Sequence, residues 1–435
     1  MEAQALAHRA IATLRHAGHP AYLVGGCVRD LLLGVPPKDF DVATDARPDR
    51  IMILFPNSGQ VGAHFGVVLV RDEFAQVEVA TFRSDNEYTD GRRPDSVQFE
   101  TDPREDVLRR DFTINGLLMD PDSGEVLDYV EGRADLERGV VRAIGDAAVR
   151  FREDHLRLLR AIRFAARLNF TIDPATFEAM RKCHAQIRSV SAERVRDELA
   201  RILTEGGAKR GFELLDESGM LAEILPEVSA MKGVEQPPQY HPEGDVWVHT
   251  LLLLEGLRQP SLTLALGALL HDVGKPPTFR VAERIRFDGH AEEGARMTRV
   301  ILQRLRFSND VTEQVEMLVA NHMRFKDVPK MRDSKLKRFL RMPDFPELLE
   351  LHRLDSMAGS RRLENYELVR QKLQEIPVEH LKPKLLVTGT DLIAAGYRPG
   401  PMFSTILTAV EDAQLDGRIH STDEGLALVR ELFPQ

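Results

Sequence analysis

The stretch LVGGCVRDLLLG (residues 23–34), followed by PKDFDVAT (37–44), decides how the first part of the chain folds. A β-rich run, a glycine pair, a short apolar run and a second β-rich run predict a strand, a turn, a helix and a strand. The same alternation continues to about residue 145: AYLVGG, FGVVLVR, VEVATFR and VLDYV are predicted strands, and VRDLLLG and PDRIMILF are predicted short helices. The sequence therefore predicts an α/β head with a mixed sheet and helices.

The rest of the chain has helical periodicity and carries most of the histidines. We predict a multidomain protein in which all-α segments follow the head. The expected divisions are a head (1–145), a helical neck (146–235), a histidine-rich domain (236–360) and a helical tail (361–435), with the proline-rich run 236–242 opening the third part.

Composition narrows the class of protein. The 435 residues hold 58 basic and 68 acidic side chains, a net charge of −10, but residues 140–170 carry seven arginines against three acids, which is a local basic face. Two cysteines, Cys27 and Cys183, are too few for a disulfide framework and favour a reducing compartment. The longest apolar run, 262–270, is far short of the roughly 20 residues of a membrane span, and the N-terminus does not resemble a signal peptide. We therefore expect a cytoplasmic protein that does not enter a membrane.

Asp39 and Asp41 are the first candidates for chemistry. Their i, i+2 spacing on a predicted strand directs both carboxylates to one face, where they repel each other unless a cation lies between them. Oxygen ligands of this kind suit Mg²⁺. A solvated strand edge is the alternative. Glu78, on the strand VEVATFR, either faces water or completes the metal site.

Gly25 and Gly26 stand between a predicted strand and helix, where backbone amides can approach a phosphate, and Arg29 can reach the same anion. Taken alone, this pattern is also that of a plain tight turn.

The motifs GGCVRD, KDFD, VEVATFR, EYTDGRRP and RRDFTING, in this order, resemble the class II branch of the nucleotidyltransferase superfamily. This branch contains CCA-adding enzymes and bacterial poly(A) polymerases, and the resemblance covers residues 20–230. It implies a template-independent addition of CCA to tRNA from CTP and ATP, with Mg²⁺ held by the catalytic Asp39 and Asp41. It also implies two nucleotide-binding groups: Gly26 and Arg29 at the triphosphate, and Arg110, Asp111 and Asn115 at ribose and phosphate.

The neck segment 150–167 (RFREDHLRLLRAIRFAAR) is predicted as one helix with an apolar side and a charged side. The charged side could be a solvated face with salt bridges. Alternatively, a carboxylate, which accepts, and a guanidinium, which donates, together match cytosine and adenine but not uracil or guanine. The EDxxR stretch resembles the nucleotide-selecting motif of the family, which implies Asp154 and Arg157 at the base, with Arg160 and Arg163 nearby. A second helix, 192–203, could bind or merely support.

Alternatives to complete CCA addition remain open. The loop 84–99 (SDNEYTDGRRPDSVQF) has full length, whereas enzymes of the family that add CC lack part of it. A poly(A) polymerase or an A-only or CC-only tRNA nucleotidyltransferase would share nearly every motif. A rival of another class is a phosphohydrolase whose head only binds RNA, and an inert RNA chaperone is a third.

The histidine-rich domain resembles the HD phosphohydrolase superfamily. The implied ligands of a divalent metal, from VHT, HDVGK and LHRLDSMA, are His249, His271, Asp272 and Asp355. Imidazole and carboxylate ligands suit Mn, Fe, Co, Ni or Zn. His290 and His322 match positions that some members use for a second metal, and Lys275 could contact a phosphate. The resemblance implies hydrolysis of phosphoesters at RNA ends, and an inactive domain kept for tRNA docking is the alternative. The sequence leaves the oligomeric state open.

Overall fold

A computed structural model describes residues 2–60, 66–86, 88, 91–92, 94–239 and 241–434. The chain divides into two compact units. Unit 1 is Met1–Ser229 with Arg304–Phe307, and unit 2 is Ala230–Gln303 with Ser308–Gln435. The boundaries of the four expected domains remain predictions.

One mixed sheet organises the head, as predicted. Within the described residues seven strands follow the order β3-β4-β5-β2-β1-β8-β9, in which β2 and β5 are parallel and the other neighbours antiparallel. The strands are β1 (Ala21–Val24), β2 (Asp41–Thr44), β3 (Ser58–Gln60), β4 (Val67–Arg71), β5 (Gln76–Thr81), β8 (Leu117–Met119) and β9 (Val126–Asp128). Along β5 buried Val77, Val79 and Thr81 alternate with more exposed residues, as expected of a strand with one covered face.

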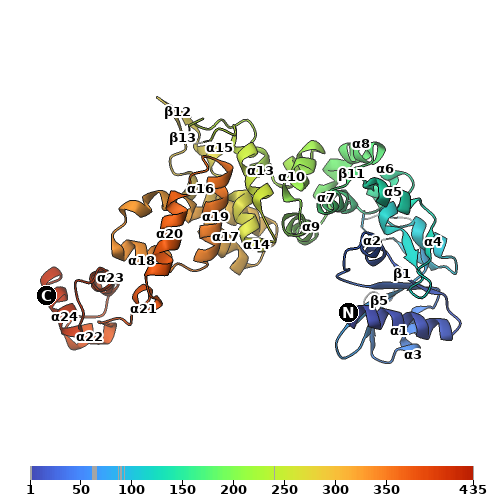
Figure 1. Ribbon diagram of the computed structural model, residues 1–435, viewed down its shortest axis with the longest axis horizontal. Coiled ribbons are helices and arrows are strands. Elements are labelled where there is room, and N and C mark those ends of the chain that lie inside the picture. The colour runs from blue at the N-terminus through green and yellow to red at the C-terminus, as the bar shows by residue number, and fades with distance from the viewer. Residues whose placement is uncertain are drawn as a thin grey trace. The chain divides into compact units, whose positions relative to one another are not determined.

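Helices cover this sheet. The head contains α1 (Glu2–His16), α2 (Gly26–Leu32), α3 (Pro48–Leu54), α4 (Pro103–Leu108), the 3₁₀ turn η2 (Thr113–Asn115) and α5 (Gly132–Arg138), with a separate hairpin of β6 (Arg83–Asn86) and β7 (Ser96–Phe99). Figure 1 shows α1 and α3 on one side of the sheet and α2 on the other. Ala7, Ala10, Ile11 and Leu14 of α1 are buried at positions i, i+3, i+4 and i+7, which lie on one helix face.

The neck is helical, with one difference from the prediction. Its elements are β10 (Val140–Val141), α6 (Ala147–Glu153), α7 (Arg157–Leu168), β11 (Thr171–Ile172), α8 (Pro174–Cys183), η3 (His184–Ser189), α9 (Ala192–Thr204), α10 (Ala208–Glu217), α11 (Met220–Ile224) and α12 (Pro226–Ser229). The segment 150–167 is not one helix, because it breaks between α6 and α7. Asp154 adopts an extended conformation (φ −140°, ψ 105°), and its carboxylate accepts a hydrogen bond from the Leu156 amide at 3.1 Å. An aspartate that bonds its own backbone in this way competes with helix continuation.

Unit 2 is almost entirely helical, as predicted. Its elements are α13 (Val246–Gly256), α14 (Leu262–Leu270), α15 (Lys275–Thr278), the strands β12 (Arg280–Val281) and β13 (Ile285–Arg286), α16 (His290–Arg304), α17 (Asn309–Asn321), η4 (His322–Lys330), α18 (Asp333–Leu340), α19 (Phe345–Ala358), α20 (Glu364–Glu375), α21 (Val378–Leu381), α22 (Gly389–Ala394), α23 (Met402–Leu415) and α24 (Thr422–Leu432). Helices α13, α14, α17 and α19 pack against one another and bury the apolar runs that the sequence displays.

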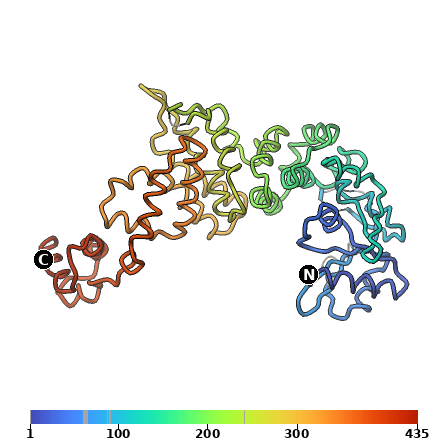
Figure 2. Tube along the Cα trace, in the orientation of Figure 1, coloured from blue at the N-terminus to red at the C-terminus, as the bar shows by residue number. Residues whose placement is uncertain are grey.

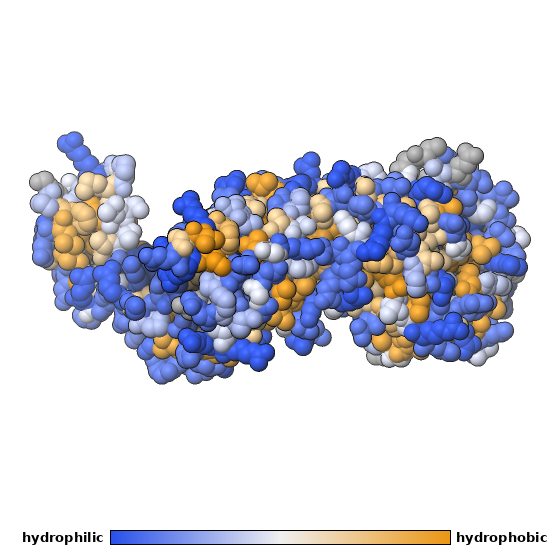
Figure 3. Space-filling view, turned by 90° about the horizontal axis from the view of Figure 1, so that it is seen from above, coloured by the Kyte–Doolittle hydropathy of each residue, from blue (hydrophilic) through white to orange (hydrophobic). Residues whose placement is uncertain are grey.

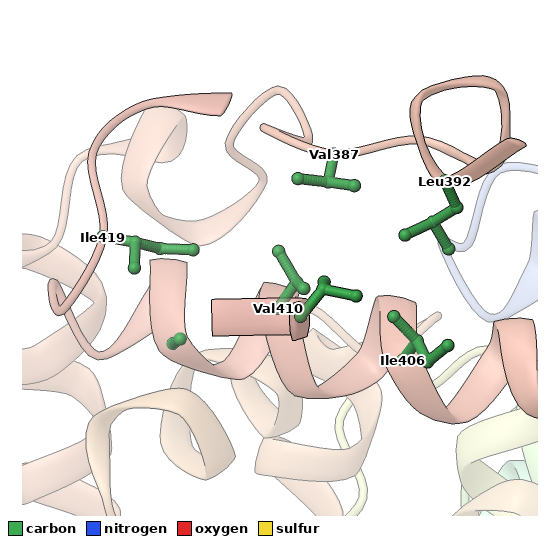
Figure 4. Close-up of a cluster of buried hydrophobic side chains, with 7 residues drawn as sticks. Val387, Leu392, Ile406, Val410 and Ile419 are labelled. Atoms are coloured by element: carbon green, nitrogen blue, oxygen red, sulfur yellow. The ribbon is translucent and has the colours of Figure 1, made fainter. Parts of the chain in front are cut away.

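The end of unit 2 has a small core of its own. Figure 2 shows the dark red end of the chain gathered into a separate bundle, and Figure 4 shows Val387, Leu392, Ile406, Val410 and Ile419 directed toward one another. These side chains come from α22, α23 and the loops beside them, and each is at most 7% exposed.

The face of the molecule in Figure 3 shows orange, apolar side chains in groups between blue, hydrophilic ones. None of the helices in the described part of the chain combines the length and the apolar character that a bilayer span requires.

Candidate functional site

Three carboxylates lie together at one end of β2. Asp41 is the first residue of β2, and its lateral neighbour on the parallel strand β5 is Glu78. Asp39 precedes the strand by two residues, so the expected strand position holds for Asp41 alone. The paired part of β2 begins at Asp41, which lies opposite Val24, the last residue of β1. Burial and the negative charges of Glu78 and Asp39 raise the pKa of Asp41 to about 6, although Arg110 opposes the shift. A cluster of repelling carboxylates fits a divalent cation.

The glycine turn and two arginines border these carboxylates. Gly25 has φ +76°, a conformation that glycine adopts at low cost, and a Cβ there would lie 3.4 Å from Nη1 of Arg110. The Arg110 guanidinium is held by Asp106, whose carboxylate accepts from Nη2 at 2.7 Å. Arg29 follows on α2 and is 2% exposed. The structure thus brings Gly25, Arg110 and Asp41 into one region.

A buried network joins the head to the neck. Arg29 Nη1 donates to Asn115 Oδ1 at 2.7 Å, and Asn115 Nδ2 donates to Asp111 Oδ1 at 3.2 Å. The other oxygen of Asp111 accepts from Nε and Nη2 of Arg160 at 2.8 and 2.6 Å. Burial would raise the pKa of Asp111, but the Arg160 guanidinium outweighs it and lowers the pKa to about 2. Four of the predicted nucleotide-binding positions are therefore bonded to one another.

Three arginine side chains lie around the aromatic ring of Phe164, at the boundary between head and neck. The guanidinium carbons of Arg29, Arg160 and Arg163 lie 5.0, 5.3 and 4.5 Å from the ring centroid. Such contacts stabilise each cation modestly. Arg163 is 4% exposed and forms an ion pair with Glu198 of α9 at 3.1 Å. Burial lowers the pKa of Arg163 to about 10 in spite of Glu198.

The two proposed base-reading residues have different partners from each other. The Asp154 carboxylate accepts two hydrogen bonds from Nη2 of Arg194, at 2.9 and 3.1 Å. Arg157 donates to Glu153 at 2.5 Å and to the backbone oxygen of Arg109 at 3.0 Å. Arg109 and Arg110 share the carboxylate of Asp106, so Arg157 is tied to the arginine that borders Asp41.

Arg194 and Glu198 are residues that the sequence interpretation left out of the site. Both belong to α9, which the sequence predicted as a helix over 192–203, and their spacing of four residues places them on one helix face. The spacing could have drawn attention to these two residues, but it could not show which neck residues they contact.

The loop 84–99 is described in part. Glu87, Thr89, Asp90 and Arg93 lie outside the described residues. Of the others, Tyr88 donates to Asp85 at 2.7 Å, and the Gly91 carbonyl accepts from the His155 amide at 3.1 Å, next to Asp154.

Unit 2 gathers the predicted histidines and aspartates. Three groups have ligand atoms close enough to share an ion. Two consist of predicted residues: His249, His271 and Asp355, and Asp272, His290 and His322. The third is His241, Glu243 and His249. The predicted residues are all buried except Asp355, which is partly exposed. In three of the histidines Nδ1 faces a backbone oxygen three residues earlier: His271 to Ala268 (3.0 Å), His290 to Phe287 (2.8 Å) and His322 to Val319 (2.7 Å). A carbonyl only accepts, so each Nδ1 carries the proton and each Nε2 offers a lone pair. The donor set therefore fits a divalent metal.

His249 differs from the other three. Its Nε2 lies 3.0 Å from Asp355 Oδ1, and its Nδ1 lies 2.6 Å from Glu243 Oε1. Burial disfavours the cation, but the hydrogen bonds to the two carboxylates outweigh burial and raise the pKa of His249 to about 9. Glu243, in the loop before α13, was not singled out from the sequence.

Close backbone packing brings these groups together. A Cβ at Gly274 would lie 2.2 Å from the His290 oxygen and 2.5 Å from the Gly294 amide, so glycine in HDVGK lets α16 approach Asp272. A cavity of about 940 Å³ opens beside the cluster and includes Asp272, Asp355 and His241. Its lining also contains five cationic side chains, Lys275, Arg284, Arg286, Arg324 and Lys326, and three further carboxylates, Asp288, Glu292 and Asp327.

Comparisons with known proteins agree with the head and neck geometry. The family model "Poly A polymerase head domain" matches residues 21–142, "Probable RNA and SrmB- binding site of polymerase A" matches 169–232, and a tRNA nucleotidyltransferase domain 2 model matches 292–429. The chain is 33% identical to the CCA-adding enzyme of Levilactobacillus brevis over 95% of this chain and 94% of that one. It is 31% identical to the CCA-adding enzyme of Streptococcus pneumoniae over 96% and 95%.

A solved structure extends the likeness to the fold. The Bacillus stearothermophilus CCA-adding enzyme, solved in complex with CTP, is 28% identical with a TM-score of 0.75, over 98% of this chain and 96% of that one. The expected resemblance to class II nucleotidyltransferases is thereby confirmed. Because the identity of 33% spans 95% of the chain, this protein belongs to the family of CCA-adding enzymes.

Proposed function

We propose that the chain adds C, C and A to the 3′ end of tRNA, taking the nucleotides from CTP and ATP without a template. The observation that carries this proposal is the cluster of Asp39, Asp41 and Glu78 beside Arg110, connected through Asp106 and Arg109 to the neck residue Arg157. Family membership supports the reaction, and the complex of the Bacillus stearothermophilus relative with CTP supports one of the substrates.

Each group of side chains has a proposed role. A divalent cation, Mg²⁺ in our proposal, would make the RNA 3′-hydroxyl more acidic and neutralise charge on the departing pyrophosphate when Asp39 and Asp41 hold it. Arg29 and Arg110 provide the positive charge for the triphosphate. In the transfer, a bond forms between the 3′-oxygen and the α-phosphorus, the bond from that phosphorus to the bridging oxygen breaks, and the hydroxyl proton is lost.

Base choice is assigned to Asp154 and Arg157. The Asp154 carboxylate accepts a hydrogen bond from an exocyclic amine, and Arg157 donates one to a ring nitrogen, a combination that cytosine and adenine satisfy. Arg194, bonded to Asp154, would hold the carboxylate in place. Arg160 would hold the neck against the head, and Arg163 would hold α7 against α9.

The test uses three RNA substrates, a tRNA ending at its discriminator base, tRNA-C and tRNA-CC, with Mg²⁺, CTP and ATP. The proposal expects extension by three, two and one nucleotides, and then arrest. Long A-tails without use of CTP would identify a poly(A) polymerase, and arrest after CC would identify a CC-adding enzyme. Unchanged extension by a variant with D39A and D41A would exclude these carboxylates from the mechanism.

A second function is favoured by a separate observation in unit 2. Four imidazoles and two carboxylates converge beside a cavity lined by cationic side chains. We propose that this cluster binds a divalent transition metal and hydrolyses phosphoesters at RNA ends. When bound, the metal would supply an acidified water for the attack on phosphorus. Lys275, whose Nζ is 2.7 Å from Asp272, would hold a phosphate oxygen.

The test of this second function compares the purified chain with the variant H271A/D272N. Release of phosphate from RNA ending in a 3′-phosphate, or opening of a 2′,3′-cyclic phosphate, should depend on added Mn²⁺, Co²⁺ or Ni²⁺ and disappear in the variant. Equal hydrolysis by both proteins would exclude the cluster, and absence of hydrolysis by the wild type would favour an inactive domain.

A further inference from the structure

Glu243 stands behind one of the candidate metal ligands of unit 2. It lies in the loop before α13 and its side chain is 6% exposed. One oxygen, Oε1, is 2.6 Å from Nδ1 of His249 and 2.9 Å from Nδ1 of His241. The carboxylate therefore bridges two imidazoles, one inside the metal-ligand group and one on the wall of the cavity.

The other histidines of the cluster show what this contact does. In His271, His290 and His322 a backbone carbonyl takes the proton of Nδ1, so their orientation is fixed by the helix to which each belongs. His249 is the member whose Nδ1 faces a side chain rather than a carbonyl among these four. A carboxylate is a stronger acceptor than a carbonyl, and a carboxylate behind an imidazole makes its other nitrogen a better electron donor.

We infer that Glu243 is a positioning residue that fixes the ring and the tautomer of His249 so that Nε2 faces the metal, and that it seats His241 on the cavity wall. This inference rests on the proposed metal site of unit 2. The loop geometry supports it, because Gly244, with φ +117°, turns the chain directly after Glu243 and lets the carboxylate fold back over the start of α13.

A different role for Glu243 would have the opposite effect on metal binding. If Glu243, His249 and Asp355 form only an ion triad, the carboxylate stabilises a protonated His249 and competes with metal binding. Removal of Glu243 would then tighten the binding of a metal ion at neutral pH. As a positioning residue, Glu243 would instead strengthen metal binding, and its removal would weaken it.

The experiment titrates the full-length protein with Co²⁺ and follows the visible absorption of the bound ion. The part of the signal that H271A/D272N lacks belongs to the unit 2 cluster. We expect E243A to weaken this binding by about 10–100-fold. E243Q should lose less, about three- to tenfold, because an amide oxygen still accepts from Nδ1 without the charge. The matched control is E283Q, the same change at an exposed glutamate of the same unit, which should bind Co²⁺ as the wild type does.

Four results decide the matter. Weaker binding by E243A, with a changed absorption spectrum and normal far-ultraviolet circular dichroism, supports the inference. Unchanged or tighter binding overturns it while leaving the metal site intact. A wild type whose Co²⁺ signal is the same as that of H271A/D272N refutes the metal site, and this inference with it. If E243A does not fold, E243Q decides alone, by weaker or by unchanged Co²⁺ affinity.

Discussion

Replacing Asp41 by asparagine should stabilise unit 1 in the absence of divalent cations. Burial and the charge of Glu78 raise the pKa of Asp41 from 3.8 to about 6. The folded state therefore resists ionisation of this carboxyl more than the unfolded state does. The loss of folding stability caused by the ionised Asp41 is fully present above the folded pKa. It diminishes as the pH falls below about 6 and is absent well below 3.8.

The magnitude follows from the size of the shift. Two pKa units correspond to about 3 kcal/mol, and because Asp41 is half-buried, solvent screening reduces this to about 1–3 kcal/mol. For a unit of this size the melting temperature should rise by about 2–12 °C. The same substitution should bring little gain at pH 4, because Asp41 of the folded state is then almost entirely protonated and the pH is close to the unfolded pKa of 3.8.

The assay is thermal unfolding of wild type, D41N and the control E73Q at pH 8 and pH 4, with EDTA or with Mg²⁺. E73Q removes a carboxylate from an exposed turn of the same unit and should change little. Added Mg²⁺ should stabilise the wild type by mass action and D41N much less. A D41N protein that is less stable than the wild type at pH 8 in EDTA would show that Asp41 is not held under electrostatic strain.

Three further predictions concern the neck and unit 2. R194A removes the cation that holds Asp154 and should lower kcat/KM for CTP and ATP, measured by single-nucleotide incorporation, by roughly 10–100-fold. The reason is that a hydrogen bond to a charged group contributes about 1.5–3 kcal/mol. D111N leaves Arg160 without its buried partner and should lower the free energy of unfolding, measured in urea, by about 3–5 kcal/mol. Because the pKa of Asp111 is lowered to about 2, the wild type should be the more stable protein above pH 4, and this difference should vanish as the pH falls through 2. G274A forces the His290 backbone away and should destabilise unit 2 by about 1–3 kcal/mol, with weaker metal binding measured in the same sample.

The fold of the head could be predicted from local patterns because each strand carries its own signal. The runs AYLVGG, FGVVLVR and VEVATFR contain the strands β1, β4 and β5, and alternation along β5 matches its buried face. The short strands β3 and β8 were not predicted, whereas β9, which is equally short, lies within the longer predicted run VLDYV. Strand order also lay beyond the pattern, since the pairing of β2 with β5 joins segments separated by a helix and two strands.

The candidate site divides in the same way. Asp39 and Asp41 were singled out from their spacing on a predicted strand, and the HD doublet from its resemblance to the HD phosphohydrolase superfamily. The break between α6 and α7 was missed, because helical periodicity continues through Asp154 and the competing hydrogen bond to Leu156 leaves no trace in the pattern. The prediction of a continuous helix placed Asp154 and Arg157 on one helix surface. Because the helix breaks between them, they do not share one.

That break bears on how one pocket can accept two bases of different size. On a continuous helix, Asp154 and Arg157 would be adjacent and would neutralise each other, with no polar edge left for a nucleotide. In the structure each is held by a different residue, Asp154 by Arg194 of α9 and Arg157 by Glu153 and the Arg109 backbone. Separate anchors give the acceptor and the donor fixed directions of their own. Cytosine and adenine both present an exocyclic amine beside a ring acceptor, so in our proposal the same pair of side chains matches either base. Selectivity for C and A over U and G then depends on Arg194 as much as on Asp154, so R194A should admit UTP more readily relative to CTP than the wild type does. Equal discrimination in the two proteins would mean that Asp154 keeps its direction without α9 and that the base is chosen elsewhere.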